Sequence, residues 1–170
     1  MLADGDGVLL RDLTRFVGGD DRPKQFCPLL GKKTLLQETQ QRAERNIPAD
    51  NILLYSLNRA RQNYYPDELG ARASQLVIQP GNKGTAPAVL YSLLHLALKD
   101  PDAVVAILPC DHYYSRETIF TGALESAFGL AQARAECVVL LGATPKGPET
   151  DMGGLSRGRV PVLTRTLFAS

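Results

Sequence analysis

The residues best suited to chemistry in this chain follow short apolar segments. An apolar run from Val104 to Leu108 ends at Pro109, and Asp111 and His112 come next. The run predicts a buried strand, and a carboxylate just past the C-terminal end of a strand in an open parallel sheet lies where ligands bind. Asp111 is therefore the first candidate for a metal or ribose contact. A capped, solvated turn is the alternative interpretation.

Two other loops carry residue types suited to phosphate. Lys24 follows a proline, and its ammonium group has the reach and charge to contact a phosphate. A second apolar run ends at Gln79, and the turn after it contains Asn82, Gly84 and Thr85. Because this turn precedes a helical pattern, its backbone N–H groups are placed to hold an anion or to read a base. A solvated lysine and an ordinary helix cap remain the alternatives.

A glycine-rich segment lies near the beginning of the chain. Gly5, Asp6 and Gly7 stand together there, and backbone N–H groups that no side chain shields can surround phosphate oxygens. Taken alone, the segment is more typical of a plain turn than of a phosphate-binding loop. A dinucleotide-binding loop is disfavoured, because Leu10 stands where its third glycine belongs.

Composition narrows the class of protein. The 170 residues are 44% hydrophobic and 22% charged with a net charge of +1, which is typical of one globular domain and disfavours a nucleic-acid or membrane-surface partner. Three cysteines without metal-ligand spacing indicate reduced thiols and no zinc site. No apolar stretch reaches membrane-spanning length, so we expect a cytoplasmic location. The sequence does not define an oligomeric state.

Predicted strands and helices alternate along the chain. A capping-box pattern at Thr34 begins a helix that extends to about Arg45, and a second helix is predicted over 85–99. A third helix is expected to begin at Ser115 as its cap. Short apolar runs predict strands at 51–57, 75–79, 104–110 and 137–141. This order favours an α/β fold with a mostly parallel sheet and helices on both faces.

Taken together, three segments closely resemble the sugar-phosphate nucleotidyltransferases, and within them the mannose-1-phosphate guanylyltransferases. The segments are residues 23–31, 80–88 and 108–112, and the resemblance extends from about Leu2 to Gly154. It implies a Rossmann-like nucleotidyltransferase fold for a partial domain, residues 1–154, that lacks its first strand and its sugar-binding half. Residues 155–170 are an unassigned tail.

The resemblance also implies an activity and the residues that perform it. An enzyme of this family forms GDP-mannose and pyrophosphate from GTP and mannose 1-phosphate, with Mg²⁺ as cofactor. Lys24 would neutralise phosphate charge, and Asp111 would bind the metal. The implied nucleotide-binding residues are Gly5, Asp6, Gly7, Gln79, Asn82, Gly84 and Thr85.

The glycine-rich loop departs from the family pattern Leu-Ala-Gly-Gly-x-Gly-Thr-Arg-Leu. Asp4 replaces a glycine, Val8 replaces the threonine and Leu9 replaces the arginine. Loss of one preorganised charge donor commonly lowers a rate on the order of a hundred- to a thousandfold. The sequence therefore leaves two interpretations open: a nucleotidyltransferase of reduced activity, and a catalytically inert module that binds a nucleotide or nucleotide sugar.

Overall fold

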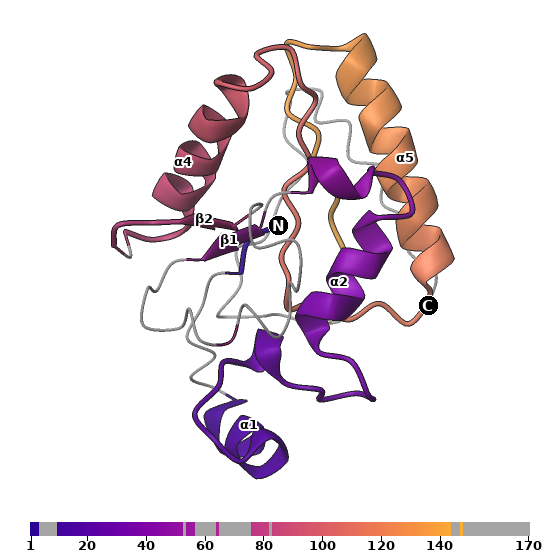
Figure 1. Ribbon diagram of the computed structural model, residues 1–170. Coiled ribbons are helices and arrows are strands. Elements are labelled where there is room, and N and C mark those ends of the chain that lie inside the picture. Colours follow the sequence, from indigo (N-terminus) through magenta and orange to yellow (C-terminus); the bar gives the residue numbers. More distant parts are fainter. Residues whose placement is uncertain are drawn as a thin grey trace. The chain divides into compact units, whose positions relative to one another are not determined.

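The computed structural model describes residues 1–3, 10–52, 54–56, 64, 76–81, 83–143 and 147. The chain divides into two compact units, Met1–Tyr113 and Tyr114–Ser170. The first unit contains α1 (Arg11–Gly18), η2 (Lys24–Phe26), α2 (Leu35–Ala43), η3 (Ala49–Asn51), β1 (Leu54–Ser56), β2 (Leu76–Ile78) and α4 (Thr85–Ala97), and the second contains α5 (Glu117–Ala133). Figure 1 follows this order along the chain, and the three predicted helices are present as α2, α4 and α5.

Strands β1 and β2 form a parallel pair. Leu54 lies opposite Leu76, and Ser56 lies opposite Ile78. The strands predicted at 51–57 and 75–79 are present, and each is three residues long.

The strands predicted at 104–110 and 137–141 are wrong for the structure as described. Residues 103–108 and 137–143 are assigned no regular secondary structure. Val104 and Val105 are each more than a third exposed, as is Leu140. Apolar composition predicts burial, but a strand also requires a neighbouring backbone that pairs with its N–H and C=O groups.

Residues 1–3 supply that neighbour at one place. The Leu2 amide donates to the Leu108 carbonyl at 2.9 Å, and the Cys110 amide donates to the Leu2 carbonyl at 3.2 Å. These two bonds make a parallel bridge between Leu2 and Pro109. The first residues of the chain therefore fix the end of the apolar run that precedes Asp111.

Helix α2 begins with the capping box that the sequence predicts. The Thr34 hydroxyl oxygen accepts a bond from the Gln37 amide at 3.2 Å, and the Gln37 side chain accepts one from the Thr34 amide at 3.1 Å. Each bond satisfies a backbone donor that has no partner within the helix. The reciprocal pair thus sets where α2 starts.

The core of the first unit joins segments that are distant in sequence. Ala3, Phe26, Leu36 and Cys110 form one buried cluster, and none is more than 4% exposed. Full burial of a side chain such as Phe26 or Leu36 stabilises a fold by about 1.5–3 kcal/mol. This cluster holds η2, α2 and the segment before Asp111 against residues 1–3.

Helix α4 packs beside the strand pair (Figure 1). Ala88 is fully buried, and Leu2, Val77 and Tyr91 pack against it. A small side chain at this position lets the helix approach β2 and the first residues of the chain closely. The predicted helix over 85–99 is confirmed, with its end at Ala97.

Helix α1 is not among the sequence predictions. It ends at Gly19, whose φ of 74° lies in the left-handed region and whose amide donates to the Arg15 carbonyl at 2.9 Å. Glycine reaches this conformation without steric cost, so it is well suited to terminate the helix.

The second unit is described through α5. Ala123 and Leu124 are buried, and the rings of Tyr114 and Phe120 lie 4.3 Å apart. The predicted Ser115 cap is wrong, because the helix begins at Glu117 and the residue before it makes no side-chain cap. Neither α5 nor any other helix in the described ranges is long and apolar enough to cross a membrane.

Candidate functional site

Lys24 and Asp111 form an ion pair. The Lys24 Nζ atom lies 2.7 Å from Asp111 Oδ2, and the two side chains are 29% and 20% exposed. Partial burial weakens the screening of this pair by water, compared with a fully exposed pair. The structure therefore brings together the two residues that the sequence singles out for catalysis.

Lys24 is the first residue of the short turn η2. The Phe26 amide donates to the Pro23 carbonyl at 2.9 Å, and the Cys27 amide donates to the Lys24 carbonyl at 3.1 Å. Gln25, which is 2% exposed, donates from Nε2 to the Ala3 carbonyl at 3.2 Å. These bonds fix the backbone from which the Lys24 side chain extends.

The backbone next to Asp111 is also bound to the first residues of the chain. Cys110, immediately before Asp111, is 1% exposed and bonds through its amide to Leu2. Burial raises the pKa of the Cys110 thiol far above its ordinary value, so this group stays neutral. The carboxylate thus stands at the boundary between an apolar core and solvent.

His112 lies farther from the Asp111 carboxylate than Lys24 does. Its Nε2 atom lies 3.8 Å from Asp111 Oδ1, and its side chain is 50% exposed. That separation exceeds hydrogen-bond distance. His112 Nε2 therefore makes no hydrogen bond to Asp111 Oδ1.

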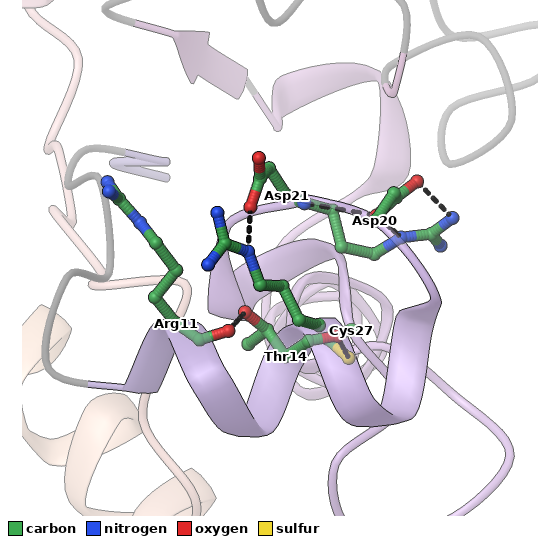
Figure 2. Close-up of polar contacts among 7 residues, drawn as sticks. Arg11, Thr14, Asp20, Asp21 and Cys27 are labelled. Atoms are coloured by element: carbon green, nitrogen blue, oxygen red, sulfur yellow. Dashed lines mark hydrogen bonds and ion pairs between the residues drawn. The ribbon is translucent and has the colours of Figure 1, made fainter.

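Asp20 and Arg22 make a compact arrangement just before Lys24 that sequence reasoning missed. Asp20 Oδ1 accepts from the Arg22 amide at 3.0 Å and from its Nε at 2.7 Å, while Oδ2 accepts from Nη2 at 3.0 Å. The hydrogen bonds from the guanidinium hold the pKa of Asp20 below its ordinary value. Figure 2 shows the contacts of Asp20 and, separately, the contact of Asp21. The donor to Asp21 is Arg15. An aspartate two residues before an arginine is the only local sequence signal for this contact, and it is a weak one.

An aromatic ring extends this arrangement toward the core. The Arg22 guanidinium carbon lies 5.7 Å from the centre of the Tyr64 ring, which stacks on Phe26 with a centroid separation of 5.6 Å. A cation over an aromatic face is attracted by the ring quadrupole. Arg22 therefore connects the loop before Lys24 to the side chain that anchors η2.

The other predicted nucleotide-binding residues have different environments. Gln79 directly follows β2 and is 4% exposed, whereas Thr85 is exposed at the first position of α4. Gly84 precedes α4 with a φ of 90°, and no side chain caps this helix start. Gly5, Asp6, Gly7 and Asn82 lie outside the described residues.

A magnesium ion at this site would be held jointly by the protein and by its substrate. Among the described residues, no group of three or more histidine, cysteine, aspartate or glutamate side chains could hold a metal ion. Mg²⁺ commonly binds one or two carboxylates, and substrate phosphates and water complete its octahedron. The Asp111 carboxylate is a donor of the type that this mode requires.

Comparison with known proteins places the chain in a family. The model of the family described as Nucleotidyl transferase matches residues 1–160. This chain belongs to the nucleotidyl transferase family. Among solved structures, it is similar to the mannose-1-phosphate geranyltransferase from Thermus thermophilus, with a TM-score of 0.73 and 33% identity over 88% of this chain and 42% of that one.

Curated relatives of this nucleotidyl transferase chain include a xanthan biosynthesis protein and a mannose-1-phosphate guanylyltransferase. The xanthan biosynthesis protein XanB of Xanthomonas campestris pv. campestris is 30% identical over 93% of this chain and 33% of its own length. The mannose-1-phosphate guanylyltransferase of Escherichia coli is 28% identical over 94% of this chain and 34% of its own length. The chain thus spans about a third of the length of these relatives.

Proposed function

We propose that this nucleotidyl transferase chain forms the nucleotide-phosphate side of a mannose-1-phosphate guanylyltransferase site. The substrates are GTP and mannose 1-phosphate, and the products are GDP-mannose and pyrophosphate. The observation that carries the proposal is the half-buried pair of Lys24 and Asp111: an ammonium group, of a type suited to phosphate, lies beside a carboxylate of a type suited to Mg²⁺. Similarity to the E. coli enzyme supports the choice of substrates.

The proposed reaction is an in-line transfer at phosphorus. An oxygen of mannose 1-phosphate forms a bond to the α-phosphorus of GTP. The bond from that phosphorus to the oxygen that bridges to the β-phosphate breaks, and its electron pair leaves with pyrophosphate. Two highly anionic reactants meet, so catalysis depends on alignment and on charge neutralisation.

Lys24 supplies the fixed positive charge in this proposal. Its ammonium group leaves Asp111 and contacts a phosphate oxygen, where it offsets the charge that develops during transfer. The backbone of η2 is held by the bonds of Gln25 and Phe26, so the Lys24 side chain moves while its backbone stays in place. The group acts by electrostatic stabilisation and needs no proton transfer.

Asp111 is the proposed metal ligand. When bound, Mg²⁺ supplies Lewis-acid charge neutralisation on the phosphates. The Asp111 carboxylate would hold the ion, and Lys24 lies beside that carboxylate. Gly5, Asp6, Gly7, Gln79, Asn82, Gly84 and Thr85 are the proposed nucleotide contacts, and of these the buried Gln79 lies at the end of β2.

A catalytically inert nucleotide-binding module is the second candidate. It is favoured by one sequence observation: Leu9 and Val8 stand where the family pattern has arginine and threonine. Under this alternative the chain retains a phosphate-binding pair but lacks the cation that accelerates transfer.

Magnesium-dependent release of pyrophosphate from GTP and mannose 1-phosphate distinguishes the two functions. The assay compares this chain with a Val8→Thr, Leu9→Arg double variant and with Asp111→Asn. Release by the unaltered chain that Asp111→Asn abolishes supports the transferase. Release by the double variant alone supports the inert module. Absence of release and of GTP binding in all three proteins would refute both.

A further inference from the structure

The loop between α1 and η2 is built around the side chain of Arg22. Asp20 engages both its backbone amide and its guanidinium group through three hydrogen bonds. Gly18 leaves room for it, because a Cβ atom there would lie 2.9 Å from Arg22 Cδ and 3.0 Å from Nε. The loop is therefore shaped to hold one conformation of Arg22.

Arg22 is separated from Lys24 only by a proline. Pro23 has an extended conformation, with φ of −60° and ψ of 153°, and its carbonyl accepts the first bond of η2. Because the ring of Pro23 fixes its φ, the backbone position of Arg22 largely determines the backbone position of Lys24. The Tyr64 ring contacts Arg22 and stacks on Phe26, the last residue of η2, so it also supports this turn.

We infer that Asp20 and Arg22 are positioning residues for Lys24: their bidentate pair fixes the backbone from which the Lys24 ammonium group reaches Asp111 and, on ligand binding, the nucleotide phosphate. The effect on nucleotide rests on the proposed function, whereas the effect on the Lys24–Asp111 pair does not. A bidentate arginine–carboxylate contact has the directionality that such a role needs.

The same loop contains a matched control. Arg15 and Asp21 also form an ion pair between an arginine and an aspartate, but their side chains are 54% and 61% exposed. Those of Arg22 and Asp20 are 30% and 41% exposed. The contact between Asp21 and Arg15 joins the loop to α1. Asp20→Asn and Asp21→Asn therefore make the same chemical change at adjacent positions.

The first measurement is the rate at which Lys24 is acetylated by a soluble acylating reagent, followed by mass spectrometry. A carboxylate that bonds to the ammonium group hinders attack by that nitrogen, so the rate reports how well the pair with Asp111 is formed. Asp111→Asn gives the rate of the open pair, and Lys99 serves as internal reference. We expect Asp20→Asn to raise the Lys24 rate about fivefold to tenfold, because asparagine keeps one acceptor oxygen but loses the charge and the second acceptor of the bidentate contact. Asp21→Asn leaves it unchanged.

The second measurement is the affinity for GTP in the presence of Mg²⁺. We expect Asp20→Asn to weaken binding about tenfold, and Asp21→Asn to have little effect. Thermal unfolding of both variants is measured alongside, because a purely structural role would lower stability without a selective change at Lys24. Arg22→Lys tests geometry, since lysine keeps the charge but cannot form the fork.

Two outcomes separate the proposals. If the unaltered chain binds no GTP while Asp20→Asn still raises acetylation of Lys24, the proposed function fails and the positioning role stands. If Asp20→Asn and Asp21→Asn leave acetylation of Lys24 equal to that of the unaltered chain, the positioning role is refuted, whatever the affinity for GTP. A selective effect of Asp20→Asn that Arg22→Lys reproduces establishes the role.

Discussion

Lys24 Nζ and Asp111 Oδ2 lie 2.7 Å apart because the segments that carry them are both bound to the first three residues of the chain. Gln25 donates to the Ala3 carbonyl, and the Cys110 amide donates to the Leu2 carbonyl. The pair thus depends on a short backbone segment that itself carries no charged side chain. Disturbing either bond is expected to affect the site as well as the stability of the fold.

The bond from Gln25 is expected to stabilise the fold measurably. Gln25→Met keeps the length of the side chain but removes the donor to the buried Ala3 carbonyl. We expect the free energy of unfolding in urea to fall by about 1–3 kcal/mol. Gln41→Met is the control, because Gln41 is exposed and bonds only to the Lys33 ammonium group in the contacts that the structure gives. Equal effects of both substitutions would contradict the role assigned to Gln25.

The capping box of α2 is expected to contribute less to the free energy of unfolding than the Gln25 bond does. Thr34→Ala removes the acceptor of the Gln37 amide, and we expect the free energy of unfolding to fall by about 1 kcal/mol. Thr34→Ser retains the hydroxyl and should recover most of that loss. Denaturation monitored by circular dichroism measures both variants. If serine and alanine are equally destabilising, the hydroxyl bond is not the stabilising feature.

The three cysteines are expected to differ in alkylation. Cys27 and Cys110 are at most 1% exposed, and burial raises the pKa of both thiols, so they stay protonated and inaccessible. Cys137 is half-buried. Iodoacetamide at pH 8 should therefore modify Cys137 first, and Cys27 and Cys110 only after addition of urea. Labelling of Cys110 in the native protein as rapidly as Cys137 would show that the core cluster is open.

Burial of Cys110 also predicts a loss of stability in alkali. In the unfolded chain this thiol loses its proton near its ordinary pKa of 9.0, whereas in the folded chain the raised pKa retains the proton. The folded state then binds more protons than the unfolded state, so the free energy of unfolding falls as the pH rises above 9, by up to about 1.4 kcal/mol per pH unit. Below pH 9 this contribution is constant. Cys110→Ala should flatten the decline between pH 9 and 10.5, and Cys137→Ala should not.

Part of this structure could be predicted from sequence because the signals are local. The capping box of Thr34 and Gln37 and the apolar spacing in α4 involve neighbours in sequence. The resemblance to a known family predicts that Lys24 and Asp111 act at one site, and the structure brings them together. Their nucleotide-binding roles, with those of the other predicted residues, remain predictions.

The parts that sequence reasoning missed depend on partners elsewhere in the chain. The run at 104–108 is apolar enough for a strand, but in the described structure only Leu2 pairs with its end. Helix α1 was missed because its apolar residues follow the glycine-rich loop, and Gly19 is as typical of a turn as of a helix end. The Asp20–Arg22 contact was missed because two charged residues in a loop are more often solvated than paired.

The most direct test of the central claim is calorimetric titration with GTP, with and without Mg²⁺, of the unaltered chain and of Lys24→Gln, Asp111→Asn and Lys33→Gln. The account predicts that Mg²⁺ strengthens GTP binding to the unaltered chain and to Lys33→Gln. It predicts that Lys24→Gln weakens binding about tenfold in both conditions, and that Asp111→Asn loses the magnesium effect but still binds metal-free GTP. Identical affinities in all four proteins, or a magnesium effect that survives Asp111→Asn unchanged, would contradict the account.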